Sequence, residues 1–145
     1  MPVTATPVFI QTPKITPQSF VQPTDAAGTY KTIFTAGPNG SKVVSIMVNT
    51  TDNTATHLLV LVLQRGGVNY TLIYYTLPVN AGGDGTTPSV DLLAGGTANL
   101  FVGLPFDNDG QRYLFLEPGD SLQLNYNTAL TASKSIYVNT IGAHF

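Results

Sequence analysis

The sequence predicts an all-β protein built as one antiparallel β-sandwich domain. From residue 29 onward, short runs of alternating apolar and polar residues are separated by Gly, Pro, Asn and Asp. No stretch shows the longer period of an amphipathic helix. The chain has 145 residues, of which 43% are hydrophobic, and this is the size of a single domain with one core.

The expected strands can be placed in order along the chain. Residues 57–64 are apolar on both faces, which is typical of a central strand, and Gly66 and Gly67 predict a tight hairpin after it. The glycine-rich segment 80–111 predicts a long connection between the halves of a Greek-key sandwich. About eight strands with such a connection indicate a jelly-roll-like fold. The strands are expected at residues 30–34, 44–48, 57–64, 69–79, 112–116, 121–126 and 135–141, with shorter pieces at 90–93 and 100–102.

The period of two also predicts which side chains share a face of each strand. The first strand should carry Tyr30, Thr32 and Phe34 on one face. Between residues 69 and 79, the same rule places Tyr70, Leu72 and Tyr74 together. The side chains expected on the inner faces of two further strands are Val44, Ile46, Val48, Leu122, Leu124 and Tyr126.

Residues 1–24 form a segment of their own, an extended arm that precedes a sandwich domain at residues 25–145. Prolines recur through the arm at intervals that exclude a helix, and large apolar side chains lie between them. The arm should therefore pack on its own sandwich or on a neighbouring subunit. The alternative is a first edge strand with a loosely held start.

The composition indicates which partners to expect. Only 10% of residues are charged, and the net charge is −2, with the basic residues scattered singly. A phosphate-binding face needs clustered Lys and Arg, so nucleic acid is not expected as a direct partner. There is no cysteine, and neither a signal peptide nor a membrane-spanning run is expected. A surface rich in Thr, Asn, Ser and Gln is typical of a sandwich surface or of a wet protein interface.

Catalytic and metal-binding patterns are sparse. His57 and His144 are expected to be interface or loop residues, no nucleophile motif accompanies them, and no cofactor or catalytic residue is predicted. Asp107 and Asp109 resemble the front of a calcium loop, but Pro118 stands where the loop would need a glutamate. A plain Asp-Gly turn is the better interpretation. Asp52, Asp84 and Asp120 also lie in expected turns, where an aspartate caps backbone amides.

The aromatic residues allow two interpretations. Six tyrosines could form a platform for stacking sugars, but tyrosine is also a good strand former, and the second interpretation is preferred. Phe101 and Phe106 lie in the glycine-rich connection, where little else can bury them, and are expected to contact a partner. The six tyrosines are Tyr70, Tyr74, Tyr75, Tyr113, Tyr126 and Tyr137.

Several turns and strand edges between residues 29 and 142 resemble a known group of proteins. They are LPVNAGGDG at 77–85, PSVDLL at 88–93, LP at 104–105 followed by DNDG at 107–110, and LEPGDSL at 116–122. Together they resemble capsid decoration, or cement, proteins of tailed bacteriophages, which have a jelly-roll-type sandwich. The match lies in turns and not in a catalytic signature.

The resemblance implies a structural virion protein on the outer surface of a capsid. Such a protein bridges neighbouring subunits of the major capsid protein and stabilises the shell through many repeated contacts. Copies of the chain should associate, as a homotrimer or alternatively a homodimer; no enzymatic activity and no membrane partner are implied. The alternatives are the receptor- or glycan-binding head of a phage fibre, and a neck or baseplate component. The residues expected to contact the partner are Val8, Phe9, Ile10, Phe20 and Val21 in the arm, with Phe101 and Phe106 as secondary contacts.

Overall fold

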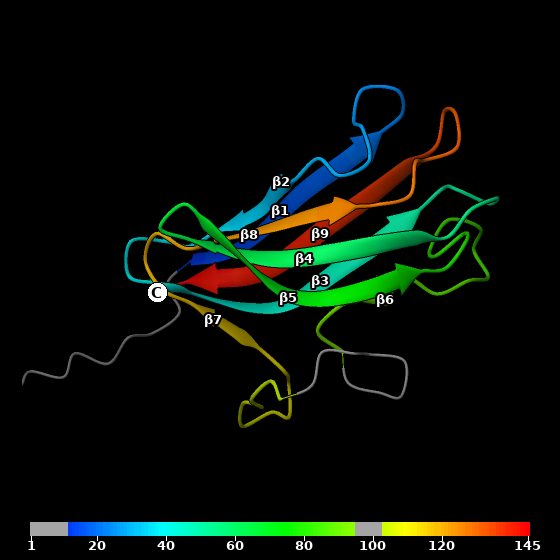
Figure 1. The fold of residues 1–145 in the computed structure, drawn as a ribbon. Coiled ribbons are helices and arrows are strands. Elements are labelled where there is room, and N and C mark those ends of the chain that lie inside the picture. The colour runs from blue at the N-terminus through cyan, green and yellow to red at the C-terminus, as the bar shows by residue number, and fades with distance from the viewer. Residues whose placement is uncertain (1–11, 95–102) are drawn as a thin grey trace, which may run out of the picture.

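The computed structural model describes residues 12–94 and 103–145, and in these residues the chain forms two antiparallel β-sheets packed face to face (Figure 1). No helix occurs in the described residues. Nine strands are present in them: β1 (Thr12–Val21), β2 (Lys31–Thr35), β3 (Ser41–Thr50), β4 (His57–Arg65), β5 (Val68–Leu77), β6 (Val90–Asp91), β7 (Leu114–Leu116), β8 (Ser121–Tyr126) and β9 (Ser135–His144). The predicted all-β sandwich is confirmed.

The strand order is that of a jelly roll. One sheet has the order β1-β9-β3-β6, and the other has the order β2-β8-β4-β5. β6 and β7 both pair with β3 on the same side, β7 near the start of β3 and β6 near its end. These two short strands therefore share one edge of the first sheet. Strands from opposite ends of the chain therefore pair: β1 with β9, β2 with β8, β3 with β6 and β7, and β4 with β5. This arrangement is a long hairpin rolled into two layers, which is the jelly-roll topology.

The core lies between the two sheets and is mostly aliphatic, with the rings of Phe20, Phe34 and Tyr126 buried among the aliphatic side chains. β4 is flanked by β8 and β5, and Leu59, Val60, Leu61 and Val62 are all buried, as expected for a central strand. The predicted inward face of β8 is confirmed, since Leu122, Leu124 and Tyr126 are fully buried. The glycine pair after β4 has positive φ angles of 59° and 79°, which fits the tight hairpin turn to β5.

Register shifts change which side chains face inward on three strands. In β3 the shift lies between Val43 and Ser45, so Val43 is buried in place of the expected Val44. In β2 the shift lies between Thr32 and Phe34, so Phe34 is buried while Thr32 is exposed. In β5 the shift falls at Leu72, so Tyr70 and Tyr74 lie on opposite faces of the strand. The strict alternation predicted for these segments is wrong at these positions.

The boundary of the expected arm also changes. β1 pairs with β9 along its whole length, from Thr12 opposite His144 to Val21 opposite Ser135. β1 is the edge strand of its sheet, so residues from 12 onward are part of the sandwich. This corresponds to the alternative of a first edge strand. Residues 1–11 lie outside the described residues.

Candidate functional site

The candidate site is the outer face of β1, β9 and β3. Alternate residues of a strand point to opposite faces, and Phe20, Ile136 and Val48 point into the core. Their neighbours therefore point outward, in three cross-strand rows fixed by the register. The rows are Ile15, Ile141 and Ser45; Pro17, Asn139 and Met47; and Ser19, Tyr137 and Asn49. Val21 extends the face at the end of β1, and we call these ten residues the outer β1-β9-β3 face.

None of the ten residues of the outer β1-β9-β3 face is charged, and large apolar side chains are exposed on it. The Asp91 carboxylate borders the face, since Asp91 pairs with Met47 and accepts a hydrogen bond from the Ser45 hydroxyl. Ile15 is 65% exposed and Tyr137 is 44% exposed, while Val21 and Met47 are each more than a third exposed. Between them lie amide and hydroxyl side chains. Exposed apolar residues mixed with neutral polar ones are typical of the composition of protein interfaces.

A shallow groove of about 530 Å³ runs across the middle of this face. Its lining consists of Pro17, Gln18, Ser19, Asn49, Tyr137 and Asn139. The Asn49 Oδ1 atom is buried without a hydrogen-bond partner. The groove thus offers one aromatic ring and neutral hydrogen-bonding groups to whatever lies on the face.

Several charged side chains are paired with one another away from this face. Lys31 Nζ lies 2.8 Å from a carboxylate oxygen of Asp25, and Lys42 Nζ lies 2.8 Å from Asp107. Arg65 donates from Nε and Nη2 to both carboxylate oxygens of Asp120, each at 2.7 Å. The hydrogen bonds from Arg65 hold the pKa of the Asp120 carboxyl below its usual range. These three lysine and arginine side chains therefore have their charges neutralised within the chain.

The predicted contact residues divide into those outside the described residues, those that are exposed, and Phe20, which is buried. Val8, Phe9, Ile10 and Phe101 lie outside the described residues. Val21 is on the outer β1-β9-β3 face, and Phe106 is 58% exposed on the loop before β7.

Phe20 needs correction as a contact residue. It is 0% exposed and packs edge-to-face on Tyr126, with ring centroids 5.3 Å apart. A partner could reach this ring only if β1 left the sandwich. Phe20 therefore belongs to the core and not to the contact surface.

Asp107 holds the loop before β7 together. Its Oδ1 accepts the backbone N–H groups of Asp109 and Gln111, and its Oδ2 accepts a hydrogen bond from Lys42. The Gly110 N–H donates to the Asp107 carbonyl, which closes the turn predicted for this Asp-Gly sequence. Among the described residues, no group of three or more His, Asp or Glu side chains is placed to hold a metal ion. The guanidinium of Arg112 lies over the Phe106 ring, 5.0 Å from its centroid.

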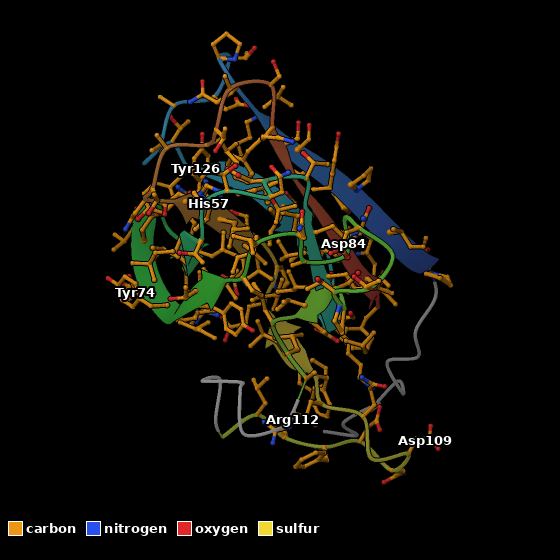
Figure 2. All side chains as sticks on the ribbon, turned by 90° about the vertical axis from the view of Figure 1, so that its right-hand side faces the viewer. His57, Tyr74, Asp84, Asp109, Arg112 and Tyr126 are labelled. Carbon is orange, nitrogen blue, oxygen red and sulfur yellow. The ribbon has the colours of Figure 1, made fainter. Side chains whose placement is uncertain are left out.

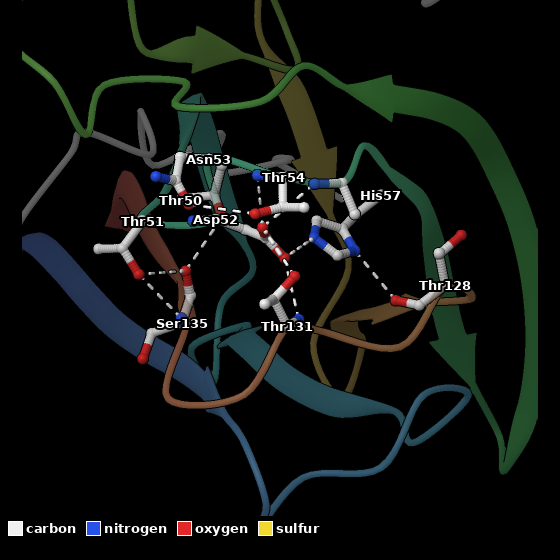
Figure 3. Close-up of polar contacts among 10 residues, drawn as sticks. Thr50, Thr51, Asp52, Asn53, Thr54, His57, Thr128, Thr131 and Ser135 are labelled. Carbon is white, nitrogen blue, oxygen red and sulfur yellow. Dashed lines mark hydrogen bonds and ion pairs between the residues drawn. The ribbon is translucent and has the colours of Figure 1, made fainter.

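A buried polar network joins the β3–β4 and β8–β9 loops at one end of the sandwich (Figure 3). Asp52 is fully buried, and its Oδ1 accepts hydrogen bonds from the Thr54 and Ala55 N–H groups and from the Thr131 hydroxyl. Its Oδ2 accepts the Thr131 N–H and lies 2.9 Å from His57 Nε2. Burial raises the pKa of the Asp52 carboxyl, but the hydrogen bonds from Thr131, Thr54 and Ala55 outweigh burial, so the net pKa lies well below the usual value.

His57 completes this network and corrects the expectation of a loop or interface histidine. The ring is fully buried, and its other nitrogen, Nδ1, lies 2.9 Å from the Thr128 carbonyl oxygen. Nε2 thus faces the Asp52 carboxylate and Nδ1 faces a backbone carbonyl, so each ring nitrogen lies within hydrogen-bond distance of an oxygen acceptor. The Asp52–His57 pair holds the two loops together. Because both side chains are fully buried, a substrate could not reach them.

His144 lies at the opposite end of the sandwich. Its Nδ1 is 2.6 Å from the Ser41 hydroxyl at the start of β3, whereas His57 follows the end of β3. Ser41 is fully buried and also accepts the Gly37 N–H. The two histidines therefore share no site, and the serine beside His144 is closed to solvent.

The tyrosines do not form one platform. Tyr126 is in the core, Tyr74 is exposed on β5 of one sheet, and Tyr137 is exposed on β9 of the other. Figure 2 shows Tyr74 on the outer side of the sandwich, far from the loop that carries Asp109 and Arg112. The interpretation of tyrosine as a strand former therefore fits its placement better than a shared sugar platform.

Sequence reasoning missed most of the outer β1-β9-β3 face and the Asp52–His57 pair. Met47 had a usable signal, because it is a large apolar residue at an outward position of a strand. His57 had one too, since a histidine at an inward position of an apolar strand needs a buried partner.

No protein-family model matches the chain, and no curated protein sequence matches it. No helix in the described residues has the length and apolar character needed to cross a membrane.

Proposed function

We propose that this chain is a structural virion protein that decorates a bacteriophage capsid and stabilises it by bridging neighbouring subunits of the major capsid protein. The observation that carries the proposal is the uncharged outer β1-β9-β3 face, where Ile15, Val21, Met47 and Tyr137 are exposed. A rigid sheet that presents such a face suits docking on another protein surface. The turn sequences that resemble decoration proteins agree with this role.

The position of the face relative to the chain start supports the same proposal. Val21 and Ile15 lie on β1, the strand that directly follows residues 1–11 with their apolar Val8, Phe9 and Ile10. Contacts from this segment and from the outer β1-β9-β3 face would be continuous along the chain. One contact of modest strength, repeated over a shell, gives a large total stabilisation by multivalency.

Copy number in the virion tests the proposal. In purified virions that contain this chain, densitometry should give a copy number close to that of the major capsid protein. A few dozen copies or fewer would contradict decoration and would favour a fibre, neck or baseplate component.

A charge placed on the face should prevent binding. We expect Val21→Lys and Ile15→Lys to reduce binding to shells that lack the protein by about tenfold or more each, because a lysine must lose its water in an apolar contact. Cosedimentation with such shells measures the effect. Thr35→Lys is the matched control, since Thr35 is exposed at the end of β2 in the other sheet. Equal binding by all three variants would rule the face out.

A second candidate function, glycan binding by the head of a fibre, is favoured by the groove beside Tyr137. An aromatic ring flanked by Asn49 and Asn139 presents the stacking surface and amides that a sugar ring can use. A glycan array with the wild-type chain and Tyr137→Ala tests it. Binding that is lost in the variant would support this function in place of decoration, and an array without signal would remove it.

A further inference from the structure

The two long edge strands of the sandwich differ in how open they are to another strand. On the free edge of β1, Pro13 and Pro17 have no N–H to donate. The Ser19 N–H is taken by the Gln18 side chain, and the Val21 N–H is taken by the Asp25 carboxylate. The Ser19 carbonyl accepts a hydrogen bond from Lys31. This edge is therefore closed to strand pairing along most of its length.

The free edge of β5 has none of these protections. β5 is the last strand of the β2-β8-β4-β5 sheet and pairs only with β4 in the described residues. Its ten residues, VNYTLIYYTL, include no proline and no charged residue. In the part of the chain that the structure describes, no side chain hydrogen-bonds to the backbone of the free edge. A long, uncharged edge of this kind is a template for a further strand.

When β5 is placed antiparallel to the β5 strand of a second copy, about a two-fold axis at its middle, the residues that face each other are similar. With the two-fold axis between Leu72 and Ile73, Leu72 lies opposite Ile73 of the second copy. The outer pairs then match residues of like character: Tyr70 with Tyr75, Val68 with Leu77, Asn69 with Thr76 and Thr71 with Tyr74.

The register shift at Leu72 makes this match hold for the faces of the strand as well. Thr71 pairs with Val62 and Tyr74 pairs with Val60. These two β4 residues are buried, but they alternate with Leu59 and Leu61 of the core and so lie on the opposite, outer face of the sheet. Thr71 and Tyr74 are therefore on the same, outer face of the sheet, although an odd number of positions separates them. An uninterrupted strand would put them on opposite faces. In the antiparallel pair, the four pairs outside the centre therefore join residues of the same face, while Leu72 at the centre is the bulged residue that has no partner on β4.

We propose that two copies of this chain pair through β5 about a two-fold axis between Leu72 and Ile73, which joins their four-stranded sheets into one continuous sheet. The occupant of the edge is a second copy because the paired residues are similar in character and lie on the same face of the sheet. β5 also has no charged residue, so no like charges lie opposite each other in the pair. The pairing needs no capsid and goes beyond the proposed function.

Paired charges at positions 71 and 74 test the register. Both side chains are exposed, so the substitutions leave the core intact. In the dimer, Thr71→Lys with Tyr74→Lys places two lysines opposite each other twice, and we expect the dimer dissociation constant to rise roughly tenfold or more. Thr71→Lys with Tyr74→Glu is the matched control, which places opposite charges together and should remain dimeric. Sedimentation velocity and light scattering measure the mass, and circular dichroism checks that both variants are folded.

Each result decides the proposal. A wild-type chain that stays monomeric at its highest soluble concentration overturns it. So does an oligomer whose mass both variants leave unchanged, or one that both variants dissociate equally. Because the chain has no cysteine, mixing Thr71→Cys with Tyr74→Cys gives a second readout. The mixture should form a disulfide-linked dimer under oxidation far more readily than either variant alone, and equal yields would contradict this register.

Discussion

Replacing Asp52 by alanine should lower the free energy of unfolding by about 3–5 kcal/mol, which is a large share of the stability of a domain of this size. The carboxylate is fully buried. It accepts hydrogen bonds from the backbone N–H groups of Thr54, Ala55 and Thr131 and from the Thr131 hydroxyl. Without it, these donors and His57 Nε2 lose their hydrogen-bond partner inside the protein, where water cannot replace it. Urea unfolding at neutral pH, followed by circular dichroism, measures the loss.

Asp84→Ala is the matched control for this prediction. The Asp84 carboxylate also accepts the N–H groups of Thr86 and Thr87 and the Thr87 hydroxyl, but it does so in an exposed loop. Water can replace the lost acceptor there, so the variant should be far less destabilised. If Asp52→Ala lost no more stability than Asp84→Ala, the network would not hold the two loops together.

The same carboxylate predicts how stability changes with pH. The pKa of Asp52 is lower in the folded chain than in the unfolded chain, where it is about 4. The unfolded state therefore takes up the proton first as the pH falls, so the contribution of Asp52 is complete above about pH 4 and is lost below it. Unfolding measured between neutral and acidic pH should show this loss in the wild type. Asp52→Asn should show a flatter profile, and an equally steep profile would contradict the assignment.

The sequence was sufficient to predict the fold class because the alternation of side chains is a direct consequence of strand geometry. It could not predict the register shifts at Val44, Ile33 and Leu72, since a bulge depends on the neighbouring strand as much as on its own residues. Gly142 shows the dependence. It lies opposite Val43 at one of these shifts, and a Cβ atom there would come within 2.5 Å of the Lys42 carbonyl oxygen.

The candidate site was predictable only in part for a related reason. Val21 and Phe20 are adjacent apolar residues in a proline-rich segment, and composition treats them alike. Once β1 pairs with β9, they point to opposite faces, one into the core and one to solvent. The pairing partner of β1 lies more than a hundred residues away, so no local pattern could separate the two side chains.

Phe20→Ala should destabilise the chain by about 3–5 kcal/mol, because the ring fills a site between the sheets that the remaining side chains cannot close. Phe20 is fully buried, stacks edge-to-face on Tyr126 and lies under the Lys31 ammonium, 5.3 Å from the ring centroid. Val21→Ala, one residue away, should change stability by no more than about 0.5 kcal/mol. Chemical unfolding of both variants measures the difference.

Stability and binding measured together separate a core role from a contact role for β1. If Phe20 belongs to the core, Phe20→Ala lowers the free energy of unfolding. Shell binding is then weakened only because β1 detaches from the sheet, so conditions that restore folding also restore binding. If Phe20 were a contact residue instead, binding would fall while the unfolding curve stayed in place. Val21→Lys should give that second pattern, because its side chain lies on the outer β1-β9-β3 face. Opposite patterns from two adjacent residues would follow directly from the pairing of β1 with β9, since a strand sends neighbouring side chains to opposite faces.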